Sequence, residues 1–92
     1  MIKSFTHKGL YKFFTTGSSA GIQAKHINRL RAILTFLNEA ENVEDMNLPG
    51  FQLHPLKGNK KELWSVSVNG NWRIIFRFED GNAYVVDYLD YH

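Results

Sequence analysis

Two histidines, two basic side chains, a carboxylate and a tyrosine form the residue set best suited to chemistry in this 92-residue sequence. They are His54, Lys57, Arg73, Asp90, Tyr91 and His92. One histidine can take the proton of a ribose 2′-hydroxyl, another group can protonate the leaving 5′-oxygen, and Arg or Lys can stabilise the phosphate charge. The reference pKa of histidine, about 6.5, suits both proton transfers near neutral pH. These residue types indicate RNA cleavage without a metal.

Spacing alone does not separate this set from unrelated structural histidines, which are common in small domains. Other chemistries have less support. The sequence has no cysteine and no HExxH motif, and its histidines and carboxylates do not cluster at metal-ligand spacing. No glycine-rich phosphate loop follows a predicted strand, and no serine stands in a nucleophile elbow. We therefore expect no metal and no cofactor.

A predicted antiparallel sheet in the last third of the chain must position the set. From Phe51 the apolar residues recur with a period of two, and Pro55 places the first strand at an edge or makes it irregular. The next two strands alternate apolar residues with Ser65, Ser67 and Arg73. A turn at Asp80–Gly81 or Gly81–Asn82 follows, and residues 83–89 are apolar enough for a central strand. The apolar set that should face the core is Trp64, Val66, Val68, Trp72, Ile74, Phe76 and Phe78.

The turn between the second and third strands decides which side chains share a face. A two-residue loop at Asn69-Gly70 would pair Val68 with Asn71 and place the two apolar sets on opposite faces. A three-residue loop from Asn69 to Asn71 pairs Val68 with Trp72 and unites both sets on one face. Burial favours the second register, which leaves Ser65, Ser67 and Arg73 together on the other face.

Two helices are predicted before the sheet. Residues 2–5 fit a short opening edge strand, Thr6 is the expected N-cap of the first helix, and Gly17 its end. The second helix spans residues 24 to about 40 and carries an apolar stripe. Lys25 and Arg29 lie off that stripe and should point together at solvent or phosphate. His7 and His26 are interpreted as surface or boundary residues, and residues 42–50 can hold one helical turn.

Length and composition indicate a single soluble domain over residues 1–92, expected in the cytoplasm, with no membrane span or signal peptide. The net charge is only +2, but the charges fall in blocks. Residues 1–37 contain six bases and no acid, whereas residues 79–92 contain four acids and no base. Simple solvation explains such blocks as well as a polyanion partner such as RNA does.

The sequence resembles the HigB-type toxins of the RelE superfamily, bacterial toxin-antitoxin proteins that cut mRNA on the ribosome. Four stretches carry the resemblance. They are the opening MIKSFTHKGL, LHPLKG at Leu53–Gly58, LWSVSVNGNWRIIFRF at Leu63–Phe78, and the terminal DYH. The resemblance implies an α+β, RelE-like fold with two N-terminal helices on one face of a small, mainly antiparallel sheet. It also implies an endoribonuclease without a cofactor and a helix-turn-helix antitoxin as partner.

The resemblance also implies roles for individual residues. His54, Asp90, Tyr91 and His92 match the catalytic positions, and Lys57, Asn71 and Arg73 match positions that support phosphate and mRNA contacts. We expect Arg73 to act directly on phosphate charge, and Lys60 and Lys61 to bind RNA. The alternative is a non-catalytic toxin of the same fold that inhibits a target such as DNA gyrase, and the presence of both histidines argues against it.

Overall fold

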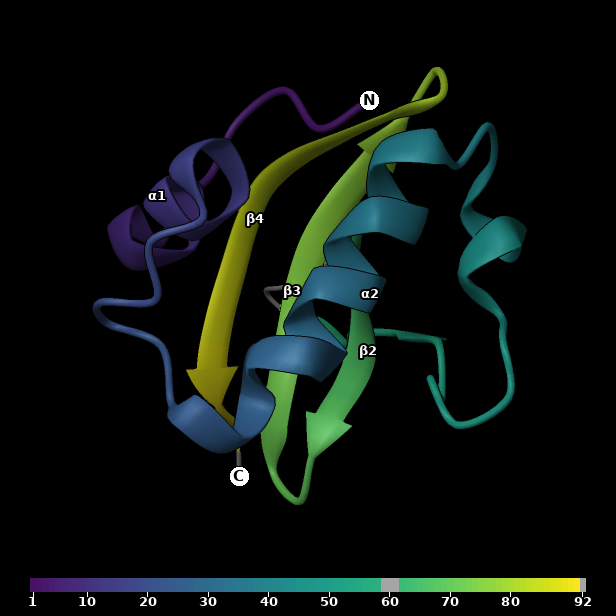
Figure 1. Ribbon diagram of the computed structural model, residues 1–92. Helices are drawn as coiled ribbons and strands as arrows, with labels where there is room; N and C mark the ends of the chain where they lie inside the picture. Colours follow the sequence, from purple (N-terminus) through teal and green to yellow (C-terminus); the bar gives the residue numbers. More distant parts are fainter. Residues whose placement is uncertain (59–61, 92) are drawn as a thin grey trace.

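The computed structural model describes residues 1–58 and 62–91 and contains one antiparallel sheet with two α-helices on one face (Figure 1). The helices are α1 (Lys8–Thr16) and α2 (Ile27–Glu39). The strand order is β1-β2-β3-β4, where β1 is His54–Pro55, β2 is Leu63–Asn69, β3 is Trp72–Glu79 and β4 is Asn82–Asp90. This arrangement confirms the expected α+β class.

The helices begin and end largely where the sequence predicts. The N-cap of α1 is an exception, because Nδ1 of His7, and not Thr6, accepts the N–H of Leu10 at 3.0 Å. Gly17 ends α1 in the left-handed conformation that glycine adopts easily, with φ +81°. The 3₁₀ turn η1 (Ala24–His26) precedes α2, and η2 (Val43–Met46) is the single turn expected after it.

The core lies between the helices and the sheet and confirms the predicted burial face. Val66, Ile74 and Phe76 are fully buried, and Trp64, Trp72 and Phe78 pack around them. The helices contribute the other half of this core, with Leu10, Phe13, Leu30, Ile33, Leu34 and Leu37. Burial of this apolar set is the main force that holds the helices on one face and leaves the other face for polar side chains.

The β2–β3 turn contains Gly70 and Asn71 and is neither of the two loops weighed from the sequence, although most of the hairpin has the register of the three-residue loop. Val66 pairs with Ile74 and Ser67 with Arg73, as the three-residue loop requires. Near the turn, however, Asn69 pairs with Trp72, and the register shifts between Ser67 and Asn69. The predicted Val68–Trp72 pair is therefore wrong, but the bulge preserves the predicted division of the two faces.

The sheet edges differ from expectation. The strand predicted as central, β4, is last in the order, although its outer side is bridged in parallel by Ile2 to Ala83 and by Phe5 to Val86. These bridges agree with the short edge strand predicted at residues 2–5. Strand β1 lies at the opposite edge, as Pro55 indicates, but it is only two residues long and Phe51 lies in a turn before it.

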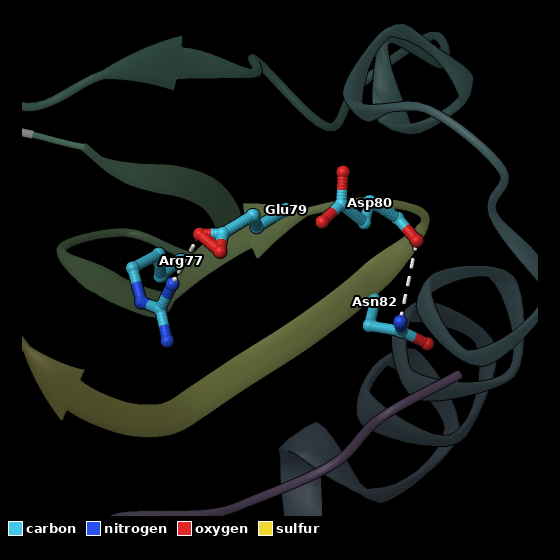
Figure 2. A network of polar contacts seen from close by, with 4 residues as sticks. All are labelled: Arg77, Glu79, Asp80 and Asn82. Atoms are coloured by element: carbon cyan, nitrogen blue, oxygen red, sulfur yellow. Dashed lines mark hydrogen bonds and ion pairs between the residues drawn. The ribbon is translucent and has the colours of Figure 1, made fainter.

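The β3–β4 turn lies at the end of the sheet away from the β2–β3 turn (Figure 1). Figure 2 shows the residues around the β3–β4 turn from close by. Asp80 and Gly81 have φ values of +50° and +78°, which confirms a turn at this point. Arg77 Nη1 lies 3.0 Å from Glu79 Oε2, and Asn82 Nδ2 donates to the Asp80 carbonyl at 3.2 Å. Among the helices within residues 1–58 and 62–91, none is long and apolar enough to cross a bilayer.

Candidate functional site

The face of the sheet opposite the helices carries the polar side chains predicted for the site. Cross-strand pairs join His54 to Ser65 and Ser67 to Arg73, so their side chains share this face. The middle of the face is covered, because Ser65 is fully buried and Ile75 is nearly so. Leu56, just after β1, is also buried but is not part of the helix-side core. We infer that Leu56 contributes to the cover of this face.

Residues from both ends of the sheet-forming segment meet at one hollow. His54, Pro55, Leu56, Lys57 and Tyr91 line an open depression of about 280 Å³. The side chains of His54 and Lys57 are exposed, and Tyr91 is half-buried. The N–H of Tyr91 donates to the Asn71 carbonyl at 2.8 Å, which ties the end of the chain to the β2–β3 turn. An extended ligand can therefore contact the side chains of His54, Lys57 and Tyr91 from solvent.

The ring of His54 has a defined hydrogen-bond partner. Its Nδ1 lies 3.0 Å from the carbonyl oxygen of Gln52. A carbonyl can only accept, so Nδ1 carries the hydrogen of this bond. In the neutral ring, Nε2 then has a lone pair and can take a proton, which is the property required of a general base.

Arg73 is held at the end of the sheet near the β2–β3 turn. Its Nη1 donates to the Gly70 carbonyl at 2.8 Å, and it lies 3.3 Å from both Ser67 Oγ and the Trp72 carbonyl. These contacts fix one end of the guanidinium. A fixed guanidinium is well suited to a phosphate, because it binds oxygens in a planar, directional geometry.

The structure brings some of the predicted residues together and not others. Asp90 is exposed at the end of β4 and pairs with Trp72, so its side chain belongs to the helix-facing row and not to the row of Arg73. Asn71 is exposed in the β2–β3 turn. Lys60, Lys61 and His92 lie outside the described residues, as does part of the predicted basic turn at residues 57–61.

His26 is buried, which contradicts the surface or boundary position expected for it. Only 1% of the residue is exposed, and Nδ1 lies 2.6 Å from Tyr88 Oη. The ring also packs edge-on against Trp72, with centroids 5.5 Å apart. Burial lowers the pKa of His26, with a further contribution from the charge of Lys25, and burial raises the pKa of Tyr88. His7, by contrast, is half-buried, as a boundary residue should be.

Arg29 also differs from its predicted role. It was expected to point with Lys25 at solvent or phosphate, but its Nη2 donates to the carbonyls of Gly50 at 2.7 Å and Ser67 at 3.0 Å. Lys25 is exposed. Helical periodicity shows that Arg29 is off the apolar stripe, but it does not show that the loop before β1 packs against that side. Among the described residues, no group of three or more His, Cys, Asp or Glu could hold a metal ion.

The sequence is similar to known proteins over nearly its whole length. A family model described as a RelE-like toxin of type II toxin-antitoxin system HigB matches residues 3–92. The chain is 42% identical over 92 residues to Endoribonuclease HigB of Proteus vulgaris, and the alignment covers 100% of both proteins. It is 33% identical over 94 residues to Toxin HigB-1 of Vibrio cholerae serotype O1, with 100% of this chain and 98% of that protein covered.

Solved structures share the fold at lower identity. A mutant of YafQ from E. coli has a TM-score of 0.57 at 19% identity, and the match covers 95% of this chain and 89% of that one. A copper-bound mutant toxin from Helicobacter pylori has a TM-score of 0.55 at 21% identity, with 98% and 94% covered. Both likenesses support the RelE-like arrangement of helices and sheet.

Proposed function

The chain belongs to the HigB-like toxins of type II toxin-antitoxin systems and is an endoribonuclease, and from this premise we propose that it cleaves mRNA on the ribosome through the residues around the β1 hollow. The observation that carries the proposal is the meeting of His54, Lys57 and Tyr91 at one exposed hollow. Arg73 lies on the same sheet face, because it pairs with Ser67, two residues along β2 from the partner of His54.

The proposed reaction is an in-line displacement at phosphorus. The ribose 2′-oxygen forms a bond to phosphorus while the bond to the 5′-oxygen breaks, giving a 2′,3′-cyclic phosphate and a 5′-hydroxyl. His54 Nε2 accepts the proton of the 2′-hydroxyl, because Nδ1 is already used on the Gln52 carbonyl. We assign protonation of the leaving oxygen to His92, by its match to the family motif.

The remaining site residues stabilise charge and orient the strand. Arg73 and Lys57 offset the negative charge that develops on the phosphate oxygens. Tyr91 stacks on a base or orients its neighbours, and Asn71 contacts the mRNA at the turn. Lys60 and Lys61 bind the RNA backbone, and Asp90 completes the catalytic set by its match to the family motif.

The ribosome has a physical role in this proposal. The hollow is open and small, so it holds a flexible RNA strand poorly by itself, and a strand already aligned on the ribosome reacts without that entropic cost. The lysines of the N-terminal segment would contact ribosomal RNA. A toxin of this class has an antitoxin partner, which we propose to be a helix-turn-helix protein. The toxin and its antitoxin are proposed to act in the cytoplasm.

Cleavage of mRNA on purified ribosomes tests the proposal. Primer extension should map cuts within translated codons, and the upstream products should end in a 2′,3′-cyclic phosphate. His92→Gln should abolish these cuts. Arg73→Ala should leave the fold intact, as measured by circular dichroism, and lower the cleavage rate by roughly 10²-fold or more.

Thr35→Ala provides the control, because Thr35 is exposed on α2 and its hydroxyl donates to the helix carbonyl of Arg31 at 2.8 Å. It should cleave at the wild-type rate. Full cleavage by folded Arg73→Ala or His92→Gln would remove that residue from the mechanism. Growth arrest with a DNA damage response and no mRNA cleavage would instead support inhibition of gyrase.

A further inference from the structure

Arg29 joins three separate parts of the fold through one guanidinium. It projects from α2, and its Nη2 donates to the carbonyls of Gly50 at 2.7 Å and Ser67 at 3.0 Å. Its Cζ lies 4.7 Å from the centre of the Phe51 ring. The side chain therefore connects α2 to the segment that leads into β1 and to strand β2.

The segment held by Arg29 has an unusual backbone. Gly50 has φ +83° and Gln52 has φ +51°, on either side of the buried Phe51. A residue with a side chain rarely adopts a positive φ unless its surroundings impose it. Two sets of contacts hold this conformation. The Phe51 carbonyl accepts the N–H of Ser67 at 2.7 Å, and Arg29 donates to the carbonyls of Gly50 and Ser67.

The segments that Arg29 joins also hold two proposed catalytic side chains, His54 and Arg73. The Gln52 carbonyl accepts from Nδ1 of His54 at 3.0 Å. Ser67 Oγ accepts from Nη1 of Arg73 at 3.3 Å. A shift of the Gly50–Gln52 segment against β2 would therefore move the His54 ring relative to the Arg73 guanidinium.

We propose that Arg29 is a positioning residue for RNA cleavage, which fixes His54 and Arg73 relative to each other through Gly50, Phe51 and Ser67. The inference rests on the proposed function, because it takes His54 and Arg73 as groups that act on RNA. Arg29 itself does not touch the substrate. A lysine cannot replace it, since an ammonium lacks the planar face that packs on Phe51 while the same group donates to two carbonyls.

Cleavage kinetics on ribosomes separate positioning from binding. Arg29→Met and Arg29→Lys should each lower kcat by roughly 10-fold to 10²-fold, the cost expected when a reacting group is displaced by about an ångström. KM should change by only about twofold to threefold, because no RNA contact is lost. Wild-type kcat in both folded variants would overturn the proposal.

A double-mutant cycle distinguishes positioning from a general loss of stability. If Arg29 acts through His54, Arg29→Met should have little further effect in a His54→Ala background. Arg77→Met is the matched control, because Arg77 also packs on an aromatic ring: its Cζ lies 4.4 Å from the centre of the Tyr84 ring. Arg77 is paired with Glu79, near the β3–β4 turn and away from the site (Figure 2). Its small effect should be the same in both backgrounds. An equal loss from Arg29→Met in both backgrounds would overturn the proposal.

Nitrogen NMR of the His54 ring gives a readout that does not need activity. Arg29→Met should alter the ring signals of His54, and Arg77→Met should not. If Arg29→Met fails to fold, Arg29→Lys replaces it, because lysine keeps the positive charge but loses the planar contact with the Phe51 ring. Unchanged His54 signals in the folded variant would overturn the proposal. A His54→Ala chain that cleaves normally would instead contradict the proposed function, while the NMR result would still show whether Arg29 holds the His54 ring in place.

Discussion

At the scale of single residues, the contact between His26 and Tyr88 couples the stability of the fold to pH. The His26 ring is buried between Tyr88 and Trp72, and its Nε2 is buried without a partner within the described part of the chain. Protonation would place a charge there. Burial therefore lowers the pKa of His26 below its ordinary value of 6.5.

The sign of the pH effect follows from this direction. The unfolded chain binds the His26 proton more tightly than the folded chain, so acid favours unfolding. The contribution of the neutral ring is complete above the ordinary pKa of 6.5 and is lost as the pH falls toward the lower folded value. We expect the free energy of unfolding to decrease from about pH 7.5 to about pH 5, partly through this residue.

Urea denaturation of the wild type and of His26→Gln measures this contribution. The difference in unfolding free energy between the two should shrink as the pH is lowered, because only the wild type loses stability through His26. Tyr88→Phe, which removes one hydroxyl and keeps the ring, should cost about 1–3 kcal/mol at neutral pH. A difference between wild type and His26→Gln that stays constant over the whole pH range would contradict the role of His26.

Sequence patterns locate the polar residues of the site better than they assign residues such as His26 and Arg29. Alternation along β2 and β3 places Ser67 and Arg73 on one face, because parity in a strand is fixed by the backbone. His26 lies in the 3₁₀ turn η1, where helical periodicity no longer holds. The partners of Arg29 come from a loop and from another strand, and nothing local in the sequence indicates them.

At the scale of elements, the start of α1 offers a direct comparison between sequence and structure. Thr6 has the residue type preferred at an N-cap, yet His7 Nδ1 accepts the N–H of Leu10 and thereby caps the helix. Thr6 Oγ1 instead lies 3.3 Å from the Val85 carbonyl, at the edge of β4. The choice depends on where the bridges of the N-terminal segment to β4 place the chain.

Replacement of each candidate cap tests this assignment. His7→Ala should lower the free energy of unfolding by about 1 kcal/mol, because the first turn of α1 loses its acceptor. His7→Asn should lose less, since asparagine is a good N-cap. Thr6→Ala should change stability less than His7→Ala, as measured by thermal or urea unfolding. A larger loss from Thr6→Ala would show that Thr6 is the cap.

In the β2–β3 hairpin, burial and the turn determine the register of different parts. Burial of Trp64, Val66 and Ile74 on one face predicts the register along most of the hairpin, and the structure agrees. The pairing of Asn69 with Trp72 leaves Gly70 and Asn71 in the turn, with Gly70 at φ +57°, and the bulge absorbs the one-residue difference in register. Apolar content is a weaker guide for β4, because an edge strand can be buried by helices and by the N-terminal segment.

At the scale of the whole molecule, the two faces of the sheet have different tasks. One face is buried by α1 and α2 and provides the stability of the domain (Figure 1). The other is closed in its middle, at Ser65 and Ile75, and presents the hollow of His54, Lys57 and Tyr91. The alternating pattern predicts this division, whereas it does not predict that Leu56, just after β1, is buried away from the helix-side core.

Dependence on translation is the central claim of the proposed function, and a pair of reporter mRNAs tests it most directly. The two reporters are identical except that one lacks its start codon, and their 5′ ends are mapped by primer extension after the toxin is induced. We predict cuts within the codons of the translated reporter, few or none in the untranslated one, and none with His92→Gln. Equal cleavage of both reporters would contradict ribosome dependence, and growth arrest without cleavage of either would contradict the assignment of mRNA as the substrate.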